Sequence, residues 1–100
     1  MKIRLLRSAL EDLASGRKFY DKQGEGLGGY FFDSLFADID SLVLTGGVHR
    51  KVFGCHRLLA KRFPYAVYYT VAAEEIRVWR VLDCRRNPQW IQTELRKRLT

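Results

Sequence analysis

The hydrophobic residues of this chain change their spacing near residue 50, and this change limits the folds that the chain can adopt. Before it, apolar residues recur every three or four positions, which is the period of an amphipathic helix. After it, β-branched and aromatic residues form short runs bounded by turn residues, which is typical of strands. Helices followed by a meander of strands predict an α+β fold, with the helices on one face of a mostly antiparallel sheet.

The first half predicts a short strand followed by a helix. Residues 2–6 alternate between polar and apolar side chains, as a strand does. Ser8 and Glu11 have the spacing of a capping box, which predicts that a helix of about 15 residues starts there. Asp12 adds negative charge to the first turn, where the helix dipole favours it. The packing face of this helix is expected to contain Leu10, Leu13 and Tyr20.

The second predicted helix covers residues 28–44 and follows a glycine-rich connection at Gly24 and Gly26. Its apolar side chains form a wide stripe, which should pack against a sheet. Two helices joined by a short turn predict a helical hairpin. The aspartates Asp33, Asp38 and Asp40 are expected on the solvent side.

The second half predicts strands at residues 50–53, 57–63, 66–72 and 76–83. Pro64 is expected in a turn, because proline cannot donate a hydrogen bond to a sheet. Val67, Tyr69 and Val71 alternate onto one face, which we assign to the core. The sequence does not decide which side chains of residues 76–83 face the core, because charged and apolar side chains are mixed on both faces of this strand.

Asn87 and Pro88 predict the start of a short C-terminal helix, because asparagine is a good N-cap and proline suits the first helical position. Its packing face is expected to contain Trp90, Ile91, Leu95 and Leu99, and its last turn carries Arg96, Lys97 and Arg98. Residues 1–100 therefore predict a single α+β domain. In this domain a helical hairpin packs on a small, mostly antiparallel sheet of three or four strands.

Positive charge is concentrated in the second half of the chain. Residues 1–49 hold six Lys/Arg and seven Asp/Glu, whereas residues 50–100 hold twelve and four, and the formal net charge is +7. This segregation predicts an anionic partner for the second half, either a polyanion or an acidic protein. The alternative is that the charge serves only solubility.

Other features argue against several classes of protein. No apolar run reaches the roughly 18 residues of a membrane span, and charges interrupt the N-terminal segment, so we expect a cytoplasmic protein with no membrane partner. Cys55 and Cys84 are too few for a disulfide framework, and no metal site or cofactor is expected. The glycines at residues 24–29 do not form a phosphate loop. Cys55 and His56 would face opposite sides of a strand, which argues against a nucleophile and its base.

Basic and aromatic residues are interleaved in the second half. Arginines neutralise phosphate, and flat aromatic rings stack on unpaired bases. An RNA-cutting site could also be built without a metal, if one group activates the ribose 2′-OH and arginines stabilise the phosphate charge. In the alternative interpretation, strand tyrosines fill the core and arginines are solvated at the rims. The interleaved basic residues are Arg50, Lys51, Arg57, Lys61, Arg62, Arg77, Arg80, Arg85 and Arg86, and the aromatic residues are Tyr65, Tyr68, Trp79 and Trp90.

The runs RLLAKRFPYAVYYTV and IRVWRVLDCRRNP, preceded by SALEDL and the helical hairpin, resemble the RelE/ParE superfamily of toxins. The resemblance covers nearly the whole chain in element order. It implies the toxin of a bacterial type II toxin–antitoxin system, of the plasmid stabilisation type, which a cognate antitoxin neutralises. It also implies one of two targets: RelE-like toxins cleave mRNA on the ribosome, whereas ParE-like toxins inhibit DNA gyrase and are not nucleases.

The resemblance implies site residues only in part. If the chain is an enzyme, it is a metal-independent endoribonuclease with Arg57, Arg62 and Arg86 as catalytic residues. Target binding would then fall to Lys61, Tyr65, Arg80, Arg85 and Trp90. Three positions depart from the pattern of cleaving members: Ala66 stands where an arginine follows the tyrosine, Leu59 where a lysine can stand, and Asp83 where a histidine is frequent. These departures weaken the ribonuclease interpretation. They leave open a non-catalytic, degenerate toxin that serves as an antitoxin-binding or nucleic-acid-binding module.

Overall fold

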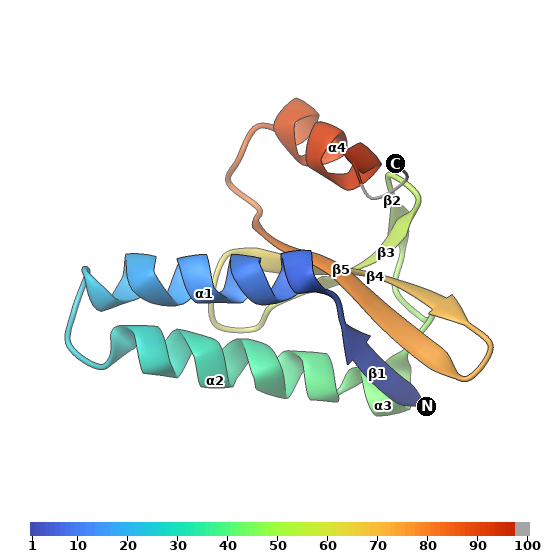
Figure 1. The fold of residues 1–100 in the computed structure, drawn as a ribbon, viewed down its shortest axis with the longest axis horizontal. Helices are drawn as coiled ribbons and strands as arrows, with labels where there is room; N and C mark the ends of the chain where they lie inside the picture. Colours follow the sequence, from blue (N-terminus) through green and yellow to red (C-terminus); the bar gives the residue numbers. More distant parts are fainter. Residues whose placement is uncertain (98–100) are drawn as a thin grey trace.

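A computed structural model describes residues 1–97 of the 100-residue chain. Two helices cover one face of a sheet and a third long helix lies on the other face (Figure 1). The elements in chain order are β1 (Lys2–Leu5), α1 (Arg7–Asp21), α2 (Leu27–Asp40), α3 (Leu42–Thr45), β2 (Lys51–Val52), β3 (Cys55–Leu59), β4 (Tyr65–Ala72), β5 (Glu75–Asp83) and α4 (Pro88–Arg96).

The sheet has five strands in the order β1-β5-β4-β3-β2. β1 pairs in parallel with β5, and the other three pairings are antiparallel. The α+β class and the mostly antiparallel sheet are therefore as expected. The sheet exceeds the expected three or four strands because the N-terminal strand joins it beside β5. The expectation that all helices cover one face is wrong, since α4 packs on the face opposite α1 and α2.

The predicted start of α1 is wrong, and the difference explains how α1 is attached. The helix begins at Arg7 without a side-chain cap. Ser8 lies inside it and donates its hydroxyl to the carbonyl of Trp79 at 2.7 Å, while Asp12 accepts from the amide of Val81 at 2.9 Å. β1 pairs with β5 only as far as Val78, so beyond that point α1 satisfies backbone groups of β5.

The packing of α1 and α2 differs from the predicted stripes at two positions. Leu10 is 47% exposed, and Asp38, expected on the solvent side, is buried. The carboxylate of Asp38 accepts a hydrogen bond from the amide of Lys61 at 3.1 Å, which compensates its burial. The core face of the hairpin consists of Ala9, Leu13, Tyr20, Phe31, Leu35 and Ile39. The predicted helix 28–44 is divided at Ser41 into α2 and the one-turn α3.

β4 is buried on both faces. Val67, Tyr69 and Val71 face α1 and α2, as predicted, whereas Ala66 and Tyr68 lie in a second cluster with Ile91 and Leu95 of α4. The β4–β5 register shifts next to Tyr68, because Tyr68 pairs with Arg80 and the next residue of β4 pairs with Val78. One extra residue of β5 therefore forms a bulge, which reverses the alternation and explains the mixed faces of residues 76–83.

The remaining predicted boundaries shift by a few residues. β3 ends at Leu59, so residues 60–64 form a loop that contains Pro64 and presents the exposed side chains of Lys61 and Arg62. Asn87 caps α4 as predicted, its side chain accepting from the amide of Gln89 at 2.7 Å. Predicted contacts of Arg98 and Leu99 lie outside the described residues.

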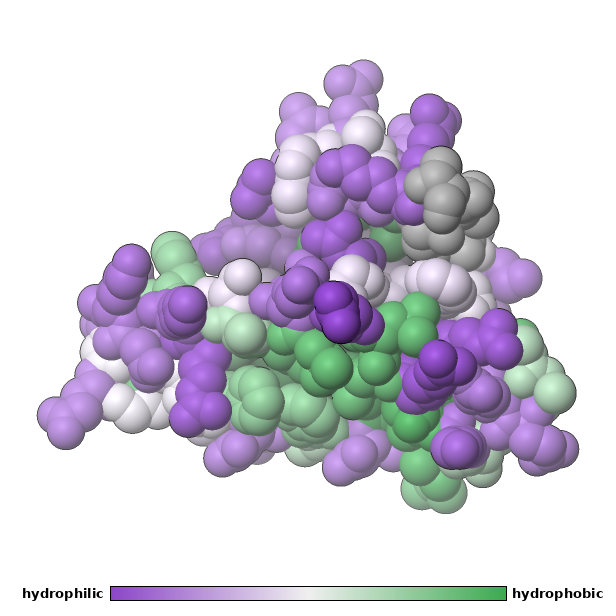
Figure 2. Space-filling view, in the orientation of Figure 1, coloured by the Kyte–Doolittle hydropathy of each residue, from purple (hydrophilic) through white to green (hydrophobic). Residues whose placement is uncertain are grey.

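The surface shown in Figure 2 has its apolar side chains over β1 and the neighbouring parts of α2 and α3, with hydrophilic side chains around them. Among the described helices, none has the length and apolar character that crossing a membrane requires.

Candidate functional site

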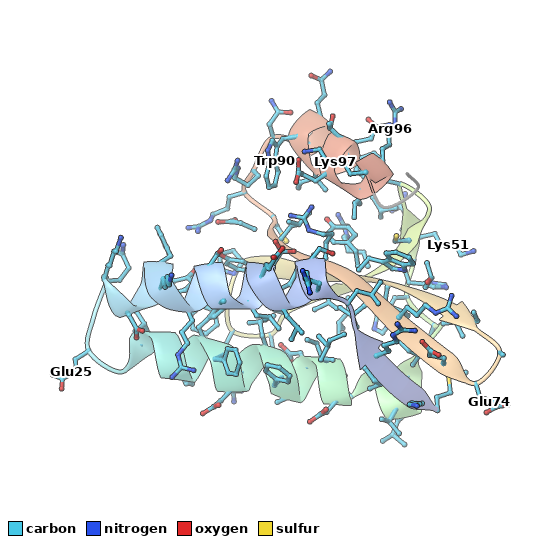
Figure 3. All side chains as sticks on the ribbon, viewed as in Figure 1. Glu25, Lys51, Glu74, Trp90, Arg96 and Lys97 are labelled. Carbon is cyan, nitrogen blue, oxygen red and sulfur yellow. The ribbon has the colours of Figure 1, made fainter. Side chains whose placement is uncertain are left out.

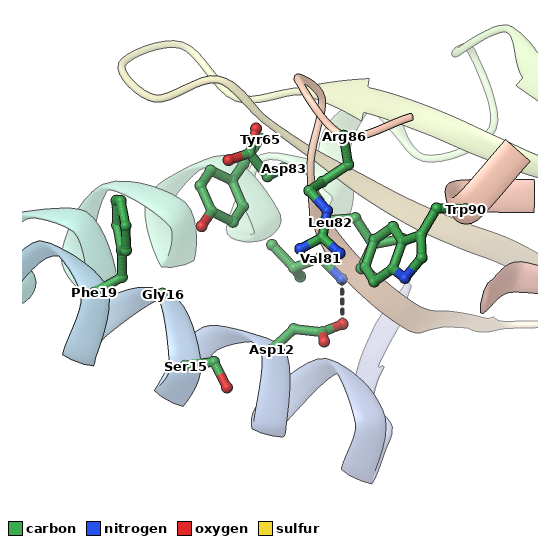
Figure 4. A pocket seen from close by; sticks show the side chains of 10 residues that line it. All are labelled: Asp12, Ser15, Gly16, Phe19, Tyr65, Val81, Leu82, Asp83, Arg86 and Trp90. Atoms are coloured by element: carbon green, nitrogen blue, oxygen red, sulfur yellow. Dashed lines mark hydrogen bonds between the residues drawn. The ribbon is translucent and has the colours of Figure 1, made fainter. Parts of the chain in front are cut away.

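A pocket of about 280 Å³ opens between α1, the C-terminal end of β5 and the start of α4 (Figure 4). Phe19 of α1 and Trp90 of α4 stand at opposite ends of this pocket in the view, and the side chain of Arg86 reaches between them. The lining consists of Asp12, Ser15, Gly16, Phe19, Tyr65, Val81, Leu82, Asp83, Arg86 and Trp90. We call it the Arg86 pocket.

The two carboxylates of the Arg86 pocket are each held by an arginine. The carboxylate of Asp12 accepts hydrogen bonds from Nε and Nη2 of Arg80, at 2.7 and 3.0 Å. Nη1 of the same arginine donates to Glu94 of α4 at 2.9 Å. The side chains of this triad are only 14–15% exposed. Arg80 thus joins α1 to α4 across β5. Hydrogen bonds from Lys97 and Arg80 lower the pKa of Glu94.

Asp83 makes a second local pair, with Arg85. The carboxylate accepts from Nε and Nη2 of Arg85 at 3.0 and 2.7 Å, and also from its backbone amide. These hydrogen bonds lower the pKa of Asp83. The side chain of Arg85 is therefore engaged within its own loop.

Arg86 is arranged differently from its neighbour. Its guanidinium carbon lies 3.8 Å from the centroid of the Trp90 ring, which is a close cation–π contact. Tyr65 lines the same pocket from the start of β4. Burial, and next the charge of Asp83, raise the pKa of Tyr65 to about 12, so its phenol stays protonated at neutral pH.

Arg57 does not line the Arg86 pocket. It lies opposite Tyr68 in the β3–β4 register, on the sheet face that α4 covers. Burial and then Cys84 raise the pKa of the Tyr68 phenol, whereas Arg57 lowers it. Burial raises the pKa of the Cys84 thiol, which disfavours the reactive thiolate at neutral pH.

The structure thus brings together three of the predicted site residues, Tyr65, Arg86 and Trp90, in one pocket. Arg85 lies beside this pocket through its pair with Asp83. Arg80 is a structural link, while Lys61 and Arg62 are exposed in the β3–β4 loop. Figure 3 labels Lys51 of β2 and Arg96 at the end of α4, and neither residue lines the Arg86 pocket.

Sequence reasoning missed the contribution of α1 to this site. The sequence predicts Asp12 only as a dipole-favoured charge and predicts no role for Phe19, yet both line the pocket. No spacing in the sequence links residue 12 to residue 80, so only the docking of α1 along β5 shows their relation. The described residues contain no group of three His, Cys, Asp or Glu that could hold a metal ion.

Comparison with known proteins supports the fold. No protein-family model and no curated protein matches the chain. A chain of the solved structure described as "Chromosomal ParDE TA system from P. aeruginosa" matches it with a TM-score of 0.72 and 23% sequence identity. The match covers 81% of this chain and 92% of that chain. The two proteins share a fold, which confirms the architecture expected from the RelE/ParE resemblance.

Proposed function

We propose that this chain is the toxin of a type II toxin–antitoxin system, neutralised by a cognate antitoxin, and that it inhibits DNA gyrase in the manner of ParE-like toxins. The observation that carries the proposal is the shared fold with a chain of the chromosomal ParDE system, over 81% of this protein. The net charge of +7 favours an acidic antitoxin as partner.

The arrangement of the arginines favours the gyrase target over mRNA cleavage. A metal-independent ribonuclease needs several cations around one phosphate. Of the three predicted catalytic arginines, Arg86 lines the pocket, whereas Arg57 lies opposite Tyr68 in the sheet and Arg62 lies in the β3–β4 loop. Two further cations, Arg80 and Arg85, are held by carboxylates.

The proposal is tested by inducible expression in bacteria together with assays of both targets. We expect growth arrest, inhibition of supercoiling by purified gyrase, and intact cellular mRNA by primer extension. Co-expression of a short reading frame adjacent to the toxin gene should restore growth. Cleaved ribosomal mRNA with active gyrase would instead support the RelE-like function, with Arg57, Arg62 and Arg86 as the residues to substitute. Normal growth with soluble, folded protein would support the degenerate binding module.

A further inference from the structure

The Arg86 pocket contains a cation that forms no ion pair within 4 Å among residues 1–97, although its charge contributes at longer range to the lowered pKa of Asp83. Its contact is with the ring of Trp90 at 3.8 Å, whereas the pocket carboxylates Asp12 and Asp83 are each engaged by another arginine at 2.7 Å. A guanidinium that stacks on an aromatic ring keeps its N–H donors in its own plane, where they remain able to bind an anion bidentately. Arg86 is therefore positioned to bind an anion that comes from outside the chain.

The rest of the pocket is suited to an apolar group. Phe19 is 48% exposed at its rim, and Val81 and Leu82 line it from β5. Gly16 also lines the pocket from α1, and glycine is required at this position by core packing, because a Cβ would come within 2.5 Å of the buried Phe31 ring. A ligand that combines one anionic group with a large apolar body matches this lining.

We propose that the Arg86 pocket binds a carboxylate from a partner polypeptide, with a large apolar or aromatic group next to it. The carboxylate pairs with Arg86, and the apolar group lies between Phe19 and Trp90. This inference rests on the proposed function, because the antitoxin is the partner polypeptide which that function implies.

The charges around Arg86 favour a protein ligand over a nucleic acid. A nucleic-acid strand carries one negative charge per nucleotide, about every 3.4 Å along a duplex strand. Phosphates flanking the one on Arg86 would find the neighbouring cations Arg80 and Arg85 already paired with Asp12 and Asp83. A single carboxylate between apolar groups needs only one cation, and Arg86 supplies it in this pocket.

The test is a ¹H–¹⁵N NMR titration of the whole chain with 3-phenylpropionate, which carries a carboxylate beside an aromatic ring. We expect shifts of the backbone amides of Gly16 and Phe19 and of the indole N–H of Trp90. The neutral amide of the same compound, 3-phenylpropionamide, should bind at least about tenfold more weakly, because hydrogen bonds to a charged acceptor are the stronger ones.

Two variants separate the pocket from the general positive charge of the protein. Arg86→Gln should lower the affinity for 3-phenylpropionate about tenfold, whereas Arg7→Gln, at the exposed start of α1, should leave it unchanged. Equal binding of the acid and the amide, or equal losses in both variants, would overturn the proposal. The proposal would also be overturned if adenosine 5′-monophosphate shifted these signals at a lower concentration than 3-phenylpropionate does.

The titration measures no growth inhibition, so the two proposals can fail separately. A chain that does not arrest growth but binds the carboxylate through Arg86 would contradict the toxin function alone. A toxic chain without carboxylate binding would contradict the pocket assignment alone.

Discussion

His49 shows how one side chain makes stability depend on pH. Its Nδ1 lies 2.5 Å from the hydroxyl of Tyr69, which also accepts from the amide of Gly47 at 3.0 Å. The hydroxyl can donate its own proton to His49 only while Nδ1 is unprotonated. Burial, and next the charge of His56, lower the pKa of His49 from its usual 6.5.

The first prediction concerns this histidine. Because the pKa of His49 is lower in the folded state, the unfolded chain binds more protons below pH 6.5. The stability contribution is present above pH 6.5 and is lost as the pH falls through the folded pKa. In urea unfolding experiments, the free energy of unfolding should decrease as the pH is lowered from 7.5 to 5. His49→Asn, which keeps an acceptor but does not titrate, should flatten this dependence, and an unchanged slope would refute the assignment.

At the scale of elements, the contact of α1 with β5 organises the molecule. Ser8 and Asp12 satisfy backbone groups of Trp79 and Val81, and Arg80 extends the contact to Glu94 of α4. α1 therefore takes over the edge of β5 where β1 ends, and this edge does not remain available for pairing with another chain.

The second prediction is that Asp12→Ala destabilises the protein by about 2–4 kcal/mol. The substitution leaves the Val81 amide, and Nε and Nη2 of the partly buried Arg80, without their acceptor. Asp33→Ala, on the exposed side of α2, should change stability by less than about 0.5 kcal/mol. Chemical denaturation measures both effects.

A double-mutant cycle with Arg80→Met tests the origin of this loss. If the ion pair is responsible, Asp12→Ala should lower the free energy of unfolding by less in the Arg80→Met background than in the parent chain. Additive losses would mean that Asp12 acts only through the Val81 amide.

At the scale of the whole molecule, β4 couples two hydrophobic clusters. Val67 and Tyr69 belong to the core under α1 and α2, while Ala66 and Tyr68 belong to the cluster under α4. Because both clusters share one strand, losing either exposes large apolar side chains of β4.

The third prediction follows from this coupling. Leu95→Ala in α4, at a position only 2% exposed, should destabilise the entire chain by about 2–4 kcal/mol, because it leaves a cavity. Far-UV circular dichroism and tryptophan fluorescence should report the same unfolding midpoint, in this variant and in the parent chain. Thr93→Ala on the exposed side of α4 is the matched control. A separate, earlier fluorescence transition would show that α4 unfolds independently.

The sequence predicted the elements whose signals are local. The cap at Asn87 and the alternation of Val67, Tyr69 and Val71 each depend on near neighbours, and both are confirmed. The Arg86 pocket was predicted only in part, because Tyr65, Arg86 and Trp90 belong to the interleaved basic and aromatic residues of the second half, whereas Asp12 and Phe19 come from a distant helix.

By itself, the sequence determined the helical first half, the strands after residue 50 and the excess of positive charge, because periodicity and composition are properties of the chain alone. Only the tertiary structure decided that Ser8 and Asp12 bind β5, that Asp38 is buried, and that Arg80 and Arg85 pair with carboxylates while Arg86 contacts the Trp90 ring. The partner of a polar group depends on which segments meet in space, and contacts across about 70 residues leave no pattern in the local sequence.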